Sequence, residues 1–287
     1  MAFDQEVGSQ NIRTTIFDGA VKGFAERQYK FKQACLISPS SAWKNYFFRE
    51  KADPLAGQSG NAIRGIPRGA NFPQAVVAWE RVLATIEKYG LEDNIQWEDI
   101  ITGEVDVRNR TLRKIAEGVA KAVDDQIWSA ITGETTIQVI NIAATKFWNG
   151  SSAAIIDDLL QAKQLMGTSN YDTSNCMAFV SPRDYRSILN YLAEKGAQFP
   201  SIANEVATNG KQGELAGIQL VVSNSVTASQ ALVVIPKICA TWKELVPLTT
   251  ITKEDHGKSV LVRSYEYGVT QVTDPQAIVW IKGTQGT

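Results

Sequence analysis

The sequence predicts a mixed α+β fold organised around one long helix. Apolar residues recur at spacings of three and four from Asp106 to Gly133, which is the periodicity of an amphipathic helix. After Gly133, short apolar runs alternate with helical patterns up to about residue 245, as in an α/β unit. Residues 246–287 then alternate strand-like runs with turns, so the chain combines an α/β unit with a strand-rich return.

The long helix has both a start signal and an end signal. Asp106 or Asn109 can accept hydrogen bonds from the first free amides, and Gly133 can end the helix. At about 1.5 Å per residue the helix would extend roughly 35 Å, enough to cross a small domain. Periodicity alone fits the core helix of any globular fold equally well. The predicted buried stripe consists of Leu112, Ile115, Ala116, Val119, Ala122, Val123, Ile127, Ala130 and Ile131.

Residues 41–78 form a connection rich in glycine and proline, and both of its ends are apolar and aromatic. Both ends favour strands, so we expect a long hairpin arm. A two-stranded ribbon cannot bury its own aromatic side chains, so the arm must pack on its own domain or on another subunit. An active-site lid is the competing interpretation. The candidate interface residues at the start of the arm are Trp43, Tyr46, Phe47 and Phe48.

Acidic residues directly precede basic residues at the start of the long helix. Four bases at a helix N-terminus oppose the helix dipole, so we expect them to have acidic partners within or between subunits. One exposed pair contributes about 0–1 kcal/mol, whereas a network repeated at an interface contributes more. The candidate contact residues in this cluster are Glu98, Asp99, Arg108, Arg110 and Arg113.

The N-terminal part of the chain predicts a helix from Asn11 to about Cys35, because apolar residues fall at spacing four. Its end, from Arg27 to Lys32, is basic with interleaved aromatic residues. One interpretation is an arm that faces phosphate or a partner. The other is a solvated helix end, where Lys and Arg favour the C-terminal dipole. We favour the solvated helix end.

The α/β unit carries several local signals. Ser151 and Ser152 can cap a helix that runs to about Met166, and Ser181 followed by Pro182 is a strong helix start. The expected strands of this unit and of the return are 136–142, 176–180, 218–222, 231–235, 246–252, 259–267 and 277–281.

Composition and charge exclude several classes of protein. The 287 residues carry a net charge of −1, which argues against a dedicated nucleic-acid-binding protein. Cys35, Cys176 and Cys239 are far apart and form no CxxC pair, so neither a zinc knuckle nor a disulfide framework is predicted. The first residues lack the pattern of a signal peptide, and no apolar run reaches transmembrane length.

Catalytic and metal-binding patterns are missing. His256 is the single histidine and sits in a charged turn. Gly257-Lys258-Ser259 resembles the end of a phosphate loop, but Thr252 stands where that motif requires glycine. The adjacent acids Asp124-Asp125 and Asp157-Asp158 diverge on a helix, and we expect them on solvated or interface faces. The sequence therefore predicts no enzyme, no cofactor and no metal site.

Several stretches, taken in order, resemble the major capsid protein of tailed bacteriophages, which has the Hong Kong 97-like fold. The resemblance covers nearly the whole chain, although no single motif is specific. It rests on WEDIITGEVDVRNRTLRKIAEGVAKAVDDQIW, CMAFVSPRDYRSIL, GELAGIQLVVSNSV followed by ALVVIPK, and KSVLVRSYEYGVTQVTDPQAIVWI.

The resemblance implies a domain scheme. Residues 1–40 would be the N-terminal arm and residues 41–78 the extended E-loop. Residues 79–132 and 246–287 would form the peripheral P-domain around the spine helix. Residues 133–245 would form the axial A-domain, which gathers at the centres of hexamers and pentamers.

The resemblance also implies function and partners. The chain would assemble with itself into an icosahedral head that encloses double-stranded DNA, which it would contact without sequence specificity. A separate scaffold protein, a portal and possible decoration proteins would be its other partners, with no role for a membrane. Its location would be the virion capsid, assembled in the host cytoplasm.

Two alternatives remain open. An encapsulin-type nanocompartment shares the fold but encloses cargo enzymes, and residues 11–35 could then dock cargo. A soluble α/β enzyme with residues 41–78 as a lid belongs to another class. It predicts a small oligomer and a pocket with perturbed titratable groups.

Overall fold

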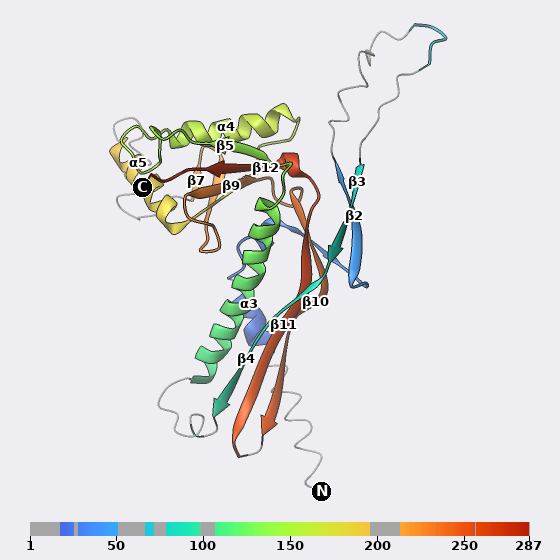
Figure 1. The fold of residues 1–287 in the computed structure, drawn as a ribbon. Helices are drawn as coiled ribbons and strands as arrows, with labels where there is room; N and C mark the ends of the chain where they lie inside the picture. The colour runs from blue at the N-terminus through green and yellow to red at the C-terminus, as the bar shows by residue number, and fades with distance from the viewer. Residues whose placement is uncertain are drawn as a thin grey trace.

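The computed structural model describes residues 18–25, 28–50, 67–71, 79–96, 98, 107–195, 213–255 and 257–286. Figure 1 shows a sheet-and-helix body at one end, a long sheet with the helix α3 beside it, and a two-stranded hairpin next to that sheet. His256 and most of the predicted arm between its two strands lie outside the described residues.

The long helix α3 spans Val107–Thr132 and confirms the predicted helix over 26 residues. All of the predicted stripe is buried except Ala122 and Ala130, which are more exposed. Trp128 and Asp124 are buried as well, so the packed surface is wider than the apolar stripe alone. The helix lies against β11 and β4.

A four-stranded sheet runs alongside α3 in the order β1-β10-β11-β4. β10 and β11 form a long antiparallel pair, β4 pairs antiparallel with β11, and β1 pairs parallel with β10. The strands are β1 (Leu36–Pro39), β4 (Glu87–Gln96), β10 (Ala240–Asp255) and β11 (Ser259–Val272).

β10 and β11 are longer than the expected strands 246–252 and 259–267, and each contains a residue that usually breaks a strand. β10 contains Pro247, and its register with β11 shifts on both sides of Val246, as at a β-bulge. β11 contains Gly268, where an added Cβ would lie 2.3 Å from Cζ2 of Trp242. Glycine at this point therefore makes room for a buried indole.

The sheet-and-helix body contains a six-stranded sheet in the order β5-β12-β9-β6-β8-β7. The strands are β5 (Gln138–Asn141), β6 (Cys176–Val180), β7 (Glu214–Leu215), β8 (Ile218–Val222), β9 (Gln230–Val234) and β12 (Ile278–Lys282). β12 lies between β5 and β9. This placement differs from the expectation that residues 246–287 all return to the long helix, because sequence order does not reveal which sheet a late strand enters.

Two helices accompany this sheet, α4 (Ile155–Thr168) and α5 (Pro182–Glu194). The start of α5 is confirmed, since the Asp184 amide donates to Oγ of the N-cap Ser181 at 3.1 Å. The predicted cap of α4 is wrong: Ala154 is the N-cap and makes no side-chain hydrogen bond. A turn that bonds the Ala153 amide to the Gly150 carbonyl places both candidate serines before the helix.

The predicted hairpin is present as β2 (Lys44–Glu50) and β3 (Trp79–Thr85), an antiparallel pair. Its second strand ends at Thr85, seven residues beyond the expected boundary at 78 (85 − 78). One large core cluster runs through both sheets, and a small separate cluster lies under the hairpin. Residues 18–25 are helical, and the short 3-10 turns are η1 (Lys32–Ala34) and η2 (Pro275–Ala277), so the helix expected up to Cys35 does not extend through residues 28–35.

Candidate assembly surface

The hairpin presents an outer aromatic face, which we define as Tyr46, Phe48, Trp79, Arg81 and Leu83. Phe48 is 60% exposed, Tyr46 and Trp79 are each 57% exposed, and Leu83 is 47% exposed. Folded chains rarely leave several large apolar side chains side by side in water, so a patch of this kind marks an interaction surface.

Strand register gathers these residues on one side of the hairpin. Tyr46 lies opposite Leu83, Phe48 opposite Arg81, and Glu50 opposite Trp79. Directly opposed residues of an antiparallel pair point to the same face. The guanidinium carbon of Arg81 lies 3.8 Å from the ring centroid of Tyr46, so a cation covers part of this ring.

The opposite side of the hairpin faces β11. Phe47 belongs to this inner side and is partly buried against Ala84, Ile86 and Val269, so one of the four predicted interface aromatics is a packing residue. Its place follows from the two-residue period of a strand, which the sequence already contains. Trp43 precedes β2, is 49% exposed, and meets Tyr267 edge-on at 5.8 Å between ring centroids.

Arg49 joins the hairpin to the rest of the molecule. Its Nη2 lies 2.5 Å from Oε2 of Glu134, just beyond α3, and its Nε donates to the Val272 carbonyl at the end of β11. Its Nη1 lies 3.8 Å from Oε2 of Glu80 in β3. The arginine side chain is only 11% exposed, so water screens these contacts weakly. No local signal in the sequence marks Arg49, because its partners Glu134 and Val272 are distant in the sequence.

Gln271 lies on the same face of β11 as the small cluster under the hairpin. It follows Val269 by two residues, which is the period of a strand, and Val269 belongs to that cluster. Gln271 is 2% exposed, and its Nε2 has no hydrogen-bond partner among the described residues. A buried amide donor without a partner destabilises a fold by about 1–3 kcal/mol.

In the basic stretch before β1, Tyr29, Phe31 and Lys32 are buried, which corrects the prediction of a solvated helix end; Arg27 lies outside the described residues. Lys32 Nζ lies 2.5 Å from Oε1 of Glu266 and 3.0 Å from Oε1 of Glu244. Tyr29 donates to Oε2 of Glu266 at 2.5 Å, and Trp242 Nε1 donates to its Oε1 at 3.0 Å. Glu266 is completely buried. These acids, and not phosphate, are the partners of Lys32, because the long strands bring them beneath the segment.

Burial and the Glu266 carboxylate raise the pKa of Tyr29 well above its usual value, which keeps the phenol protonated as a donor. Phe31 adds an apolar contact, since its ring stacks on that of Phe179 at 4.2 Å between centroids. We call residues 29–35 the N-terminal anchor. It ties the chain to both sheets at once.

Asp124 also holds the N-terminal anchor and is not solvated as expected. Its carboxylate accepts hydrogen bonds from the backbone amides of Lys30 at 2.7 Å and Lys32 at 3.3 Å. Burial raises the pKa of Asp124 to about 6, although these amides lower it. Asp158 is likewise buried, and it accepts from Trp148 Nε1 at 2.8 Å. In each adjacent acid pair, one carboxylate faces inward because a donor from another segment of the chain meets it there.

The charged cluster at the start of α3 is only partly described. Arg113 Nε lies 3.0 Å from Oε1 of Glu117, so it finds an acidic partner one turn along the same helix. Arg110 and Glu98 are exposed. Asp99 and the Arg108 side chain lie outside the described residues. Contacts of this cluster across an interface therefore stay a prediction.

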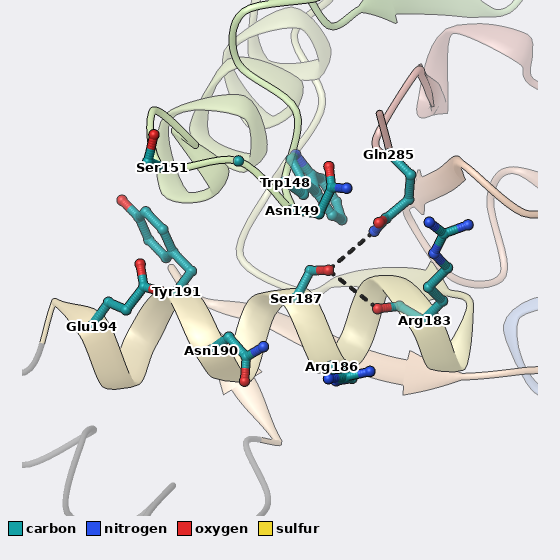
Figure 2. A pocket seen from close by; sticks show the side chains of 11 residues that line it. Trp148, Asn149, Ser151, Arg183, Arg186, Ser187, Asn190, Tyr191, Glu194 and Gln285 are labelled. Carbon is teal, nitrogen blue, oxygen red and sulfur yellow. Dashed lines mark hydrogen bonds between the residues drawn. The ribbon is translucent and has the colours of Figure 1, made fainter. Parts of the chain in front are cut away.

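A cavity of about 380 Å³ lies between α5 and the loop that precedes α4. Figure 2 shows that Arg186 points away from Trp148 on the far side of α5, whereas Arg183 lies near Gln285. Ser187 donates to the Arg183 carbonyl at 3.3 Å and accepts from Gln285 Nε2 at 3.2 Å. Ser187, Gln285 and the Arg183 carbonyl in this cavity thus bond to each other. The side chains of Arg183 and Arg186 do not point to a common position in the cavity (Figure 2).

Metal and membrane features are also missing from the part of the chain that the structure describes. No group of three or more His, Cys, Asp or Glu side chains there is arranged to hold a metal ion. No helix within the described ranges is long and apolar enough to span a membrane.

Solved structures share this fold at low sequence identity. A virus-like particle from Pyrococcus furiosus is 12% identical with a TM-score of 0.65, and the match covers 94% of this chain and 99% of that chain. The capsid of the cyanophage P-SCSP1u is 14% identical with a TM-score of 0.65, covering 88% of each chain. Capsid proteins in a structure of phage G major capsid and decoration proteins are 10% identical with a TM-score of 0.63, covering 90% of each chain.

Sequence comparison gives the family directly. No curated protein matches the sequence. The family model described as phage capsid protein, however, matches residues 79–281, which is well over half of the 287 residues. The chain therefore belongs to the phage capsid protein family, and the resemblance to tailed-phage major capsid proteins is confirmed.

Proposed function

We propose that this capsid protein assembles with itself into the hexamers and pentamers of an icosahedral head that encloses double-stranded DNA. The outer aromatic face of the hairpin is the observation that carries this proposal. Its exposed apolar side chains lie on one side of the hairpin, and a second copy of the chain repeated by symmetry can bury them at every position of a closed shell.

The domain scheme fits this role with two adjustments. Residues 1–40 serve as the N-terminal arm, and residues 41–85, which include the whole of β3, serve as the E-loop. Residues 86–132 and most of 246–287 form the P-domain around α3. Residues 133–245 form the A-domain, to which β12 adds a strand. Glu98, Asp99, Arg108, Arg110 and Arg113 contribute a second set of contacts between subunits.

The charge of the chain suits a container better than a DNA-binding protein. A net charge of −1 allows packaged DNA to be contacted without specificity and without tight binding. A scaffold protein, a portal and decoration proteins are the other proposed partners, and the phage G structure pairs major capsid with decoration proteins. The proposed location is the virion capsid after assembly in the host cytoplasm, with no enzymatic activity.

Three substitutions on the outer aromatic face test this proposal: Tyr46→Ser, Phe48→Ser and Trp79→Ser together. We expect the unassembled chain to keep its free energy of unfolding within about 0.5 kcal/mol, because exposed positions contribute little to it. Closed shells, rings and tubes should disappear in negative-stain electron microscopy and sedimentation.

A matched control changes an equally exposed aliphatic residue elsewhere. Leu160→Ser on α4, where the leucine is 48% exposed, should leave assembly intact. The proposal fails if the triple variant assembles as well as the parent chain. It also fails if the parent chain remains a monomer or dimer at high concentration with scaffold present.

One alternative keeps the shell and changes its contents. The match to the virus-like particle from Pyrococcus furiosus covers 94% of this chain, and the second candidate is an encapsulin-type shell that holds cargo protein. Particles purified from the native source separate the two. Double-stranded DNA inside supports the phage head, whereas a cargo enzyme inside supports the nanocompartment.

A further inference from the structure

The β2–β3 hairpin is attached to the body at two separate places. We propose that Arg49 is a latch that holds the hairpin against the end of β11, and that its release lets the hairpin turn about its base. This inference concerns the single chain and goes beyond shell assembly.

The base of the hairpin acts as the pivot. Here the Ile86 amide donates to the Trp43 carbonyl at 3.0 Å and closes the two strands. Ala84, Ile86 and Val269 form the small cluster beneath this end, with Phe47 and Tyr267 packed around them. The cluster is separate from the large core, so motion here leaves the core packing unchanged.

The latch lies near the far end of the described hairpin. Arg49 pairs with Glu80, and only the pair Glu50 with Trp79 lies beyond it. From there the guanidinium reaches Glu134 at 2.5 Å and the Val272 carbonyl at 3.3 Å. A contact far from the pivot controls the angle of the hairpin. The single side chain of Arg49 makes both the bond to Glu134 and the bond to the Val272 carbonyl.

A second observation, the unpaired amide of Gln271, supplies a force that would oppose the latched position. Gln271 lies on the hairpin side of β11, next in sequence to the Val272 carbonyl that accepts from Arg49. Its buried Nε2 has no partner in the described part of the molecule. When the hairpin turns away, water reaches this amide and satisfies it. The Arg49 bonds favour the latched position, and Gln271 favours release.

A balance of this kind lets one sequence adopt two arm angles. The positions in a closed shell are not all equivalent in curvature, and an arm with two angles can fit more than one of them. The latch is a property of the unassembled chain, so its failure and the failure of the proposed shell function can be told apart.

Spin labels on the full chain measure the angle. Arg81→Cys in β3 and Lys121→Cys in α3 introduce exposed thiols, while Cys35, Cys176 and Cys239 are buried and label poorly. Pulsed dipolar spectroscopy then gives the distance distribution between hairpin and helix. The parent should show one main distance.

Loss of the latch should add a second distance. In Arg49→Gln its share should rise about tenfold, the change that about 1.4 kcal/mol produces. Glu134→Gln should act in the same direction. Adding Gln271→Leu to either variant should restore most of the parent distance, because the unpaired donor is gone. Arg263→Gln, which breaks the exposed pair with Glu92 on the same sheet, should change nothing.

Each outcome decides the proposal. Arg49→Gln and Glu134→Gln giving the parent distribution would overturn the latch, as would equal broadening in Arg263→Gln. If Arg49→Gln does not fold, Glu134→Gln with and without Gln271→Leu gives the same test. No restoration by Gln271→Leu would overturn the opposing role of that amide.

Discussion

The strand β11 carries an attached segment on each face, and the two attachments are built differently. On one face Glu266 meets Lys32 and Tyr29 of the N-terminal anchor. On the other face Tyr267 and Val269 meet the β2–β3 hairpin. The first attachment buries charges that are all paired, whereas the second has a small apolar cluster, one arginine and an unpaired amide.

The two kinds of attachment determine how far each segment can move. A buried carboxylate such as Glu266 cannot lose its partners without a large rise in free energy, so the N-terminal anchor has one position. The half-buried β2–β3 hairpin packs on a small cluster only, so its movement costs little free energy. The chain thus combines a fixed entry segment with an adjustable arm on one sheet.

A substitution in the N-terminal anchor should have the largest effect on the free energy of unfolding. Lys32→Met leaves Glu266 buried beside Glu244 without a cation, and the free energy of unfolding should fall by about 3–5 kcal/mol. Urea unfolding measures it. Lys258→Met, at an exposed pair with Asp255, is the control and should change it by less than about 0.5 kcal/mol. Equal losses in both variants would contradict the comparison.

Lowering the pH should stabilise the side of the N-terminal anchor through Asp124. Its pKa in the folded chain is about 6, above the ordinary 3.8, so between these values the folded state binds more protons than the unfolded state. The contribution of Asp124 to the free energy of unfolding therefore rises as pH falls from about 7 to about 4, by up to about 3 kcal/mol.

Asp124→Asn isolates this contribution, since the asparagine does not titrate. Urea unfolding at several pH values should show the parent gaining stability relative to the variant as the pH falls. Identical pH profiles would mean that burial does not raise the pKa of Asp124.

The smallest expected effect is on the adjustable side. Ile86→Ala removes a fully buried side chain from the small cluster and should lower the stability of the hairpin by about 2 kcal/mol, at the low end for such changes. Amides of β2 and β3 should then exchange hydrogen roughly 30-fold faster, while those of β6 keep their rate. Leu83→Ala, on the exposed face, is the control. Faster exchange in β6 would show that the hairpin is not an independent unit.

Local signals in the sequence predicted much of the fold. The strand 176–180 and the helix start at Ser181 and Pro182 were confirmed, because each depends on residues that are neighbours in the chain. The partner of β12 could not be predicted, since β5 pairs with it from 141 residues away (279 − 138). The same limit hid the burial of Lys32, whose partner Glu266 is 234 residues distant.

The candidate surface was predictable in kind and not in detail. Aromatic residues beside a glycine- and proline-rich arm predicted an exposed apolar surface, and Tyr46 and Phe48 confirm that exposure. Phe47 turned inward because alternate residues of a strand face opposite sides. Arg49 and Gln271 carry no sequence signal, because their roles depend on how the hairpin lies on β11.

The position of β12 between β5 and β9 also determines when, during synthesis, the six-stranded sheet can be completed. The register joins Val279 to Gln138, so β5 has no neighbour in its sheet until 141 more residues are made (279 − 138). At about 5–20 residues per second this takes roughly 7–28 s. A ribosome-bound or truncated chain therefore holds an incomplete sheet, and only a chain translated past β12 can offer a finished building block.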